Sequence, residues 1–234
     1  MQVEIWTDIN CPFCYLGKKR FHDALDEFEN AESVQVTHRS FELDPNVPEG
    51  TSGDVVENLS KKYGRTLEQA ADGERQLAAS AREAGLEYVT SGRDMGNSFD
   101  MHRLLHWAKE LGRQETMLDA LYAANFAEPE PLFGSSDRLV EVAVGAGFEE
   151  AGVREVLDDP TRYAQDVRRD EAQAQEFGVQ GVPFYVFDRK YAVSGAQPVE
   201  LFTQALNQAW ADRPTPTLIG EGDACGPDGC EVPR

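Results

Sequence analysis

Residues 3–14, with the sequence VEIWTDINCPFC, decide the fold of this chain. Apolar and polar side chains alternate through their first half, and this period of two predicts a short strand. Aromatic and aliphatic side chains then recur at helical spacing from Tyr15 to Phe28, so a helix should follow at once. Pro12 suits the first turn of that helix, because its missing N–H group is not needed there.

Cys11 and Cys14 lie three positions apart at the predicted helix N-terminus. The unpaired N–H groups and the helix dipole favour a thiolate at Cys11. A thiolate attacks disulfides, whereas a thiol does not. Cys14, one turn further on, is placed to resolve the resulting mixed disulfide. We therefore predict a redox-active dithiol, with Cys11 partly exposed and Cys14 more buried.

Two other interpretations of this pair are half of a zinc site and inert cysteines. A structural zinc ion needs two further ligands, usually from a second close-spaced pair. Cys225 and Cys230 are spaced differently and lie near the end of the chain. A disulfide between Cys11 and Cys14 would stabilise the fold little, because it closes a very short loop. The sequence thus predicts no metal site.

The formal net charge of the 234-residue chain is −20, with six Lys, sixteen Arg and 42 acidic residues. Such a balance argues against nucleic-acid binding, which needs a basic stripe. An acidic, Lys-poor surface is typical of proteins from salt-loving organisms, because high salt screens the self-repulsion. An ordinary acidic protein is the alternative. The charge is spread along the chain, so it describes a solvated surface rather than a site.

The chain begins without a basic leader or an apolar signal segment and has no run of about 18 apolar residues. We expect a cytoplasmic protein with no membrane partner. In a reducing compartment its four cysteines are more often catalytic or metal-binding than structural.

The order of the predicted elements indicates an α/β fold with an insertion. A second strand is predicted over 32–41. After residue 160 we predict a helix from Pro160 or Thr161 to Phe177, strands over 181–187 and 191–193, and a last helix over 199–210. From residue 50 to 160 no strand is predicted; helices are predicted over 54–63, 66–84, 98–111, 114–126 and 136–146. We therefore divide the chain into one domain from residues 1–49 plus 161–212, a helical subdomain over 50–160 and a tail over 213–234. His22 and His38 are expected at the surface, and His106 half-buried.

Four stretches of the chain carry a resemblance to a known family. They are DINCPFCYLG at 8–17, NSFDMHRL at 97–104, GVQGVPF at 178–184 and SGAQ at 194–197. In this order they resemble the DsbA class of the thioredoxin superfamily and, more narrowly, its FrnE-type oxidoreductases. The resemblance implies a thioredoxin-like fold interrupted by an all-helical subdomain.

The resemblance also implies roles for individual residues. The Val182–Pro183 peptide would be cis and would face the dithiol, so that Val182 and Pro183, with Pro12 and Phe13, position the substrate. The alternative is a trans proline that begins a strand. A second implied group, Asn97, Phe99 and His102, would face the cleft from the helical domain; the alternative is that Phe99 and His102 belong to the core and Asn97 to the entry of a helix.

The predicted function is a cytoplasmic thiol–disulfide oxidoreductase, with oxidation, reduction and isomerisation all open. Well-known periplasmic DsbA proteins carry histidine where this chain has Phe13, so a less oxidising enzyme is expected. The redox-active disulfide would need no tightly bound cofactor, and the partners would be protein thiols and disulfides or a low-molecular-weight thiol. The alternatives are a glutathione-dependent isomerase or transferase, of the 2-hydroxychromene-2-carboxylate isomerase or kappa-class type, and a chaperone-like peptide-binding module.

The C-terminal stretch carries a further hypothesis. Cys225 and Cys230 flank a Gly-Pro-Asp-Gly sequence, and Pro-Asp-Gly favours a turn that would bring the two thiols together. A flexible Pro/Gly-rich linker precedes them. The pair is predicted to be an accessory redox centre that exchanges electrons with Cys11 and Cys14. The alternative is a metal-scavenging or idle tail.

Overall fold

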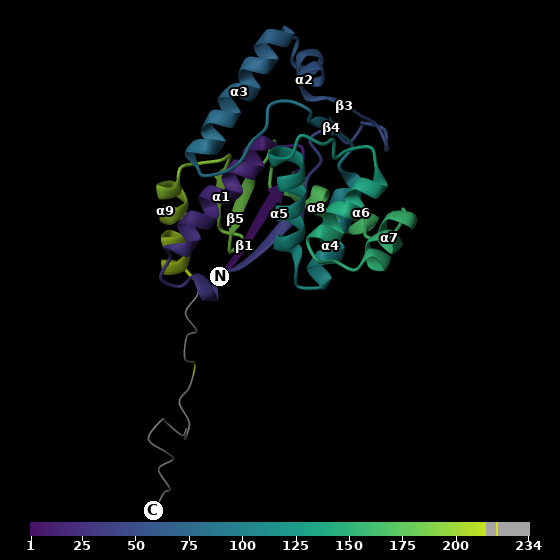
Figure 1. Ribbon diagram of the computed structural model, residues 1–234. Coiled ribbons are helices and arrows are strands. Elements are labelled where there is room, and N and C mark those ends of the chain that lie inside the picture. Colours follow the sequence, from purple (N-terminus) through teal and green to yellow (C-terminus); the bar gives the residue numbers. More distant parts are fainter. Residues whose placement is uncertain (214–218, 220–234) are drawn as a thin grey trace, which may run out of the picture.

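The computed structural model describes residues 1–213 and 219 and is built on a four-stranded sheet (Figure 1). Strand β1 (Gln2–Thr7) lies in its interior, parallel to β2 (Gln35–Ser40) and antiparallel to β5 (Phe184–Phe187). Strand β6 (Tyr191–Ser194) pairs with β5 at the other edge, so the order is β2-β1-β5-β6. The alternating pattern at the N-terminus therefore predicts its strand correctly.

Helices cover both faces of this sheet (Figure 1). On one face, α1 (Pro12–Asp26) and α9 (Val199–Ala211) pack on Val3 and Ile5 of β1. On the other face, α8 (Ala164–Glu176) packs on Trp6. The alternation of side chains along β1 thus decides which helix each residue meets. Among the described helices none is long and apolar enough to cross a membrane.

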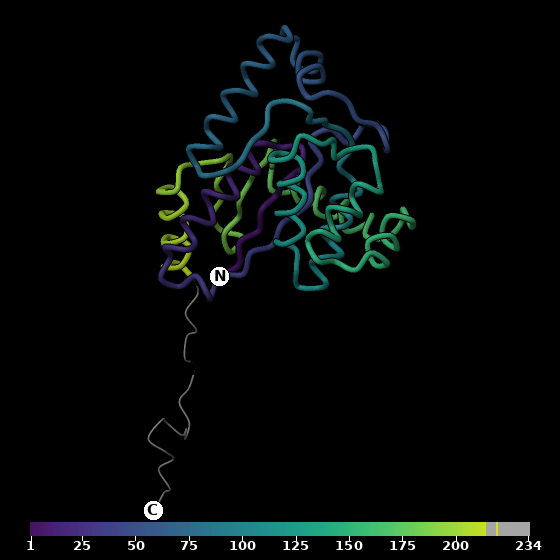
Figure 2. Tube along the Cα trace, viewed as in Figure 1, coloured from purple at the N-terminus to yellow at the C-terminus, as the bar shows by residue number. Residues whose placement is uncertain are grey.

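The chain between β2 and α8 is mostly helical and forms the largest core of the molecule. Its helices are α2 (Val55–Tyr63), α3 (Leu67–Glu83), α4 (Phe99–Glu110), α5 (Gln114–Tyr122), a π-helix at Ala123–Ala127, α6 (Ser136–Gly145) and α7 (Glu150–Asp158). In the tube view these segments arch over and beside the central strands (Figure 2). Cys11 and Cys14 belong to this helical core rather than to the cores of the sheet. The division of the chain into domains at residues 49/50 and 160/161 stays a prediction.

The prediction that residues 50–160 contain no strand is wrong. Strand β3 (Ser52–Asp54) pairs with β4 (Asp94–Gly96) in an antiparallel two-stranded sheet. Each strand has only three residues and contains a glycine, so the sequence shows no alternating pattern. The sequence analysis also predicts no helix where α7 lies. Helix α8 begins at Ala164 rather than at Pro160 or Thr161, because Tyr163 adopts a left-handed backbone conformation with φ of 61°.

The histidine positions also differ from expectation. His38 is 3% exposed, and its Nε2 lies 2.5 Å from Glu115 on α5, so its prediction as a surface residue is wrong. His22 is partly buried, 3.5 Å from the same carboxylate. His106 is buried against Ser40 and Asp170. The ion-pair and hydrogen-bond partners that hold these imidazoles inside are distant in sequence.

Candidate active site

The Cys11 thiol is held at the N-terminus of α1 by contacts on two sides. Its Sγ accepts a hydrogen bond from the Cys14 backbone N–H at 3.3 Å and donates one to the Val182 carbonyl oxygen at 3.4 Å. The Cys11 backbone N–H in turn donates to the Asp8 carbonyl at 3.1 Å. Cys11 is only 3% exposed, so the prediction of partial exposure is wrong. Packing of the helical core against the dithiol, which the helix argument did not include, buries it.

Cys14 is the second thiol and is 2% exposed. Burial raises its pKa well above the usual value, and the neighbouring Cys11 adds to this rise. Hydrogen bonds from the Thr7 side chain and the Asp8 backbone oppose the rise without overcoming it. Cys14 is therefore held as a thiol in the reduced protein, as a resolving cysteine would be.

The Val182–Pro183 peptide is cis, as the resemblance implies, and the Val182 carbonyl faces Cys11. Helix α1 lies close to this segment at Gly17. A Cβ atom at Gly17 would lie 3.0 Å from Pro183 Cγ and 2.6 Å from the Tyr185 hydroxyl. The glycine therefore lets the dithiol helix approach the cis-proline segment.

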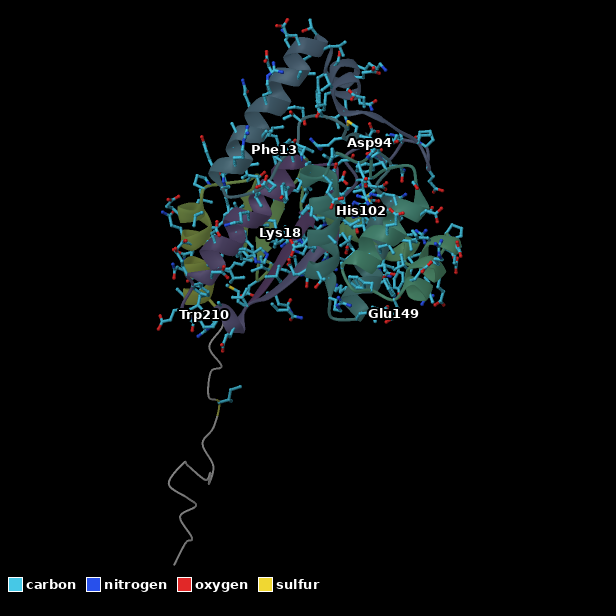
Figure 3. The ribbon with its side chains drawn as sticks, viewed as in Figure 1. Phe13, Lys18, Asp94, His102, Glu149 and Trp210 are labelled. Atoms are coloured by element: carbon cyan, nitrogen blue, oxygen red, sulfur yellow. The ribbon has the colours of Figure 1, made fainter. Side chains whose placement is uncertain are left out.

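A cleft of about 1050 Å³ opens beside the dithiol. One wall contains Asn10, Cys11, Pro12, Phe13 and Val182; the other comes from α2, α3, β3 and β4. Phe13 is 52% exposed at the start of α1, on the side that faces α3 (Figure 3). A cavity of this size suits a small molecule or a short segment of chain.

The charges of this cleft differ from those of the whole chain. Its walls hold four basic residues, Lys61, Lys62, Arg65 and Arg93, and three acidic ones, Asp44, Glu74 and Asp94. The chain as a whole has 22 basic and 42 acidic residues. The cleft therefore lacks the excess of negative charge that the rest of the chain carries.

Asn97, Phe99 and His102 do not line this cleft, so their prediction as cleft residues is wrong. The Asn97 side chain donates to the Val47 carbonyl at 2.8 Å and accepts at 2.9 Å from the N–H of Phe99, the first residue of α4. Phe99 is buried under the Arg168 guanidinium, 4.4 Å from its ring centroid. His102 is fully buried among the helices, away from Phe13 in the view of Figure 3.

Asp8 is the polar residue of this region that the sequence did not reveal. It is fully buried, and its carboxylate accepts hydrogen bonds from the Leu43 N–H at 2.8 Å and the Asn10 N–H at 3.3 Å and lies 3.4 Å from His102 Nε2. Burial alone would raise its pKa; the contacts with His102, Leu43 and Ser98 outweigh burial and lower it. A charged Asp8 thus ties α4 to the loop that carries Cys11.

Within residues 1–213 and 219, no three His, Cys, Asp or Glu side chains are grouped as a metal site. Cys225 and Cys230 lie outside the described residues.

Comparisons with known proteins agree with this architecture. A family model described as a DSBA-like thioredoxin domain matches residues 2–207. A probable DsbA oxidoreductase from Streptomyces coelicolor is 55% identical, with 100% of this chain and 99% of that chain covered and a TM-score of 0.89. A 2-hydroxychromene-2-carboxylate isomerase is 15% identical (92% and 100% covered, TM-score 0.66), and the cytosolic disulfide reductase DsbM from Pseudomonas aeruginosa is 12% identical (90% and 99% covered, TM-score 0.61). The last two show a shared fold.

Proposed function

Because the chain belongs to the DSBA-like thioredoxin domain family, we propose that it is a thiol–disulfide oxidoreductase that acts through Cys11 and Cys14. The observation that supports this most is the position of Cys11 Sγ. It lies between the Cys14 N–H and the Val182 carbonyl, beside a cis proline and at the wall of the cleft. Backbone groups on both sides of the sulfur would align an incoming disulfide with it.

The proposed reaction has two exchanges. Cys11 thiolate attacks one sulfur of the substrate disulfide; a mixed disulfide forms, and the other substrate sulfur leaves as a thiolate that takes a proton. Cys14 then loses its proton and attacks Cys11 Sγ, which closes the Cys11–Cys14 disulfide and releases the second substrate thiol. The substrate gains two electrons and the dithiol loses two; in the oxidase direction the same steps run in reverse.

Single-cysteine variants test this proposal. Cys11→Ser should abolish insulin reduction and refolding of reduced ribonuclease, whereas Cys14→Ser should accumulate mixed disulfides that a reductant releases. Pro183→Ala should weaken substrate positioning while leaving Cys11 reactive toward a small alkylating agent. Normal turnover by Cys11→Ser would rule out the proposed function.

A second candidate is a glutathione-dependent isomerase or transferase acting on a small molecule, and the size of the cleft beside Cys11 supports it. Such chemistry needs one sulfur or hydroxyl group near the glutathione thiolate and no second cysteine. An isomerisation assay with the Cys14→Ser protein separates the two candidates, because only the isomerase would remain active.

A chaperone-like binding module is a third candidate, supported by apolar side chains around the cleft. Phe13, Leu43 and Tyr63 are 52%, 40% and 60% exposed. Suppression of aggregation of an unfolded client that survives in Cys11→Ser would favour this activity.

The partners in our proposal are protein thiols and disulfides or a low-molecular-weight thiol, in the cytoplasm, with no tightly bound cofactor. Cys225 and Cys230 would form the accessory redox centre. A chain that ends at Arg213 keeps the contact of that residue with Trp210, 3.3 Å from the ring centroid. If the accessory centre operates, this shortened chain recycles slowly over many turnovers but completes one stoichiometric turnover at the normal rate.

A further inference from the structure

We propose that the cleft beside the dithiol selects disulfides that carry a carboxylate group, with Arg93 as the hydrogen-bond donor to this group and Arg65 as a nearby positive charge. This inference rests on the proposed function and names the class of substrate that Cys11 attacks. Arg65, Arg93 and Cys11 all line the same cleft. The carboxylate could belong to a low-molecular-weight disulfide or to an acidic side chain beside a cystine in a peptide, and the two sources are distinguished by experiment.

Arg93 is buried in the wall of the cleft, and only part of its guanidinium group is used by the protein. The residue is 6% exposed. Its Nη1 donates to Glu74 Oε2 at 2.6 Å and to the Tyr88 hydroxyl at 2.9 Å, and its Nε donates to the Asn125 carbonyl at 2.7 Å. Its Nη2 has no acceptor among the described residues and is not closed off from solvent. Nη2 is therefore the donor that Arg93 can offer to a ligand.

Two hydrogen bonds connect Arg93 to the loop that carries the dithiol. Asn125, whose carbonyl accepts from Arg93, donates through its side-chain amide to the Ile9 carbonyl at 2.7 Å. Ile9 lies two positions before Cys11. Asn125 belongs to the π-helix Ala123–Ala127, and π-helical turns are frequent at functional sites. The buried guanidinium group is therefore tied to the segment that positions the Cys11 sulfur.

Arg65 brings a positive charge that the protein leaves uncompensated. Within residues 1–213 and 219, its guanidinium group forms no ion pair. The other charged side chains of the cleft all have partners of their own: Asp44 with Lys62, Lys61 with Glu57, Glu74 with Arg93, and Asp94 with the backbone N–H groups of Leu132 and Phe133. An anionic group in the cleft would therefore find Arg65 available.

The two arginines meet α3 at consecutive residues. Arg65 Nη1 lies 4.0 Å from the position that a Cβ atom on Gly73 would occupy, and Arg93 pairs with the next residue, Glu74. The backbone of Arg65 is also held, because its N–H donates to the Ser60 carbonyl at 3.0 Å and its carbonyl accepts from the Ser60 hydroxyl at 2.6 Å. Both guanidinium groups therefore lie at the same turn of α3.

The charge of the whole chain predicts the opposite preference. With a net charge of −20, its long-range field attracts cationic reagents and repels anionic ones. At an ionic strength of about 0.15 M the Debye length is about 8 Å, so distant surface carboxylates are largely screened, whereas groups that contact the reagent are not. A preference for an anionic disulfide would therefore come from the cleft itself.

Three small symmetric disulfides of different charge measure this preference. Dithiodipropionate is anionic, hydroxyethyl disulfide is neutral and cystamine is cationic. The protein is full length with Cys225→Ser and Cys230→Ser, so only Cys11 and Cys14 carry thiols. The Cys11 thiolate attacks one sulfur of the reagent, a mixed disulfide forms, and the other half leaves as a thiolate that takes up a proton. Maleimide labelling follows the loss of protein thiols, and each rate is divided by that of mercaptoethanol with the same disulfide.

After this correction, the protein should react about tenfold faster with dithiodipropionate than with hydroxyethyl disulfide, and most slowly with cystamine. Arg65→Gln should lower the ratio of the anionic to the neutral rate about threefold. Glu74→Gln combined with Arg93→Gln should lower it about tenfold, because the buried donor is lost. Both partners are changed so that no buried charge is left alone. Arg169→Gln, which removes an exposed charge on α8, is the control and should leave the ratio unchanged.

A pair of disulfide-bonded peptides, with Glu or Gln beside the cysteine, identifies the source of the carboxylate. Faster reaction of the Glu peptide, lost in Arg65→Gln, would assign the cleft to acidic protein segments. A charge preference confined to the small reagents would assign it to a low-molecular-weight disulfide.

Two results would overturn the inference. One is the absence of any preference for dithiodipropionate and for the Glu peptide. The other is a ratio that falls equally in Arg65→Gln and Arg169→Gln, which would mean that only the net charge matters. Arg65 is exposed, so Arg65→Gln carries the test if the double variant does not fold. Failure of the dithiol to react with any disulfide, the neutral one included, would instead overturn the proposed function.

Discussion

The Asp8 carboxylate lies 3.4 Å from His102 Nε2, and both side chains are completely buried. Asp8→Asn should lower the free energy of unfolding at pH 7 by about 3–5 kcal/mol, because it leaves the imidazole without its buried partner. The pKa of Asp8 is lower in the folded protein than its ordinary value of 3.8, which applies to the unfolded chain. The contribution of Asp8 to the free energy of unfolding is therefore fully present above the unfolded pKa and is lost as the pH falls through the folded pKa. The difference between wild type and variant, measured by urea unfolding, should therefore shrink below about pH 4.

Asp26→Asn is the matched control, since Asp26 is exposed at the end of α1. It should change the stability by less than about 0.5 kcal/mol at either pH. A destabilisation of Asp8→Asn that stays constant from pH 7 to about pH 3 would contradict a charged Asp8 in the folded state.

Gly17→Ala should destabilise the protein by about 1–3 kcal/mol, because the added methyl group would lie 2.6 Å from the Tyr185 hydroxyl and 3.0 Å from Pro183 Cγ. Gly145→Ala is the control: it is also helical, and no atom lies within 4 Å of the added Cβ. That variant should be neutral or more stable by up to about 1 kcal/mol. Thermal unfolding measures both, and equal effects would show that contact with Tyr185 and Pro183 is unimportant.

Phe13→His should raise the reduction potential of the dithiol, on the order of 30 mV. The imidazolium would favour a neighbouring thiolate and so stabilise the reduced form, whereas Phe13 is neutral. Since Phe13 is 52% exposed, the change should leave the core intact. Equilibration with glutathione buffers gives the potential, and Phe13→Leu, which adds no charge, should match wild type. Equal potentials for the His and Leu variants would refute this effect.

The net charge of −20 leads to a prediction about salt. Raising KCl from about 0.1 M to about 1 M shortens the Debye length from about 10 Å to about 3 Å, so repulsion among surface carboxylates weakens. The midpoint of thermal unfolding should therefore rise. Chloride is the suitable anion, because sulfate strengthens burial of apolar surface by itself. A midpoint that does not change over this range would remove the case for a salt-adapted protein.

The parts of the fold that were predictable have strong local patterns. The alternating residues of β1, the helical spacing after Cys14 and the capping glycines are all short-range signals. Gly64, Gly85, Gly112 and Gly147 adopt φ values of 63°, 77°, 68° and 83°, where glycine is favoured.

The parts that were missed depend on tertiary contacts. Gly152 weakened the helical signal of α7, yet the structure needs a glycine there, because a Cβ atom would lie 2.5 Å from the Trp107 ring. His38 is buried because it pairs with Glu115, and His102 because it lies beside Asp8; in each case the partner is far away in sequence. The cleft likewise arises from the placement of α2 and α3 above the dithiol, which no local pattern specifies.

The interior position of β1 has a consequence for synthesis of the protein. Val3 pairs with Val36 on one side and with Phe187 on the other. The first partner leaves the ribosome early, but the second requires nearly the whole chain, which takes roughly 10–40 s at the usual rate of elongation. Until then one edge of β1 has no partner in the sheet and can pair with another nascent chain. The helices between β2 and α8, whose contacts are local, can fold during this interval.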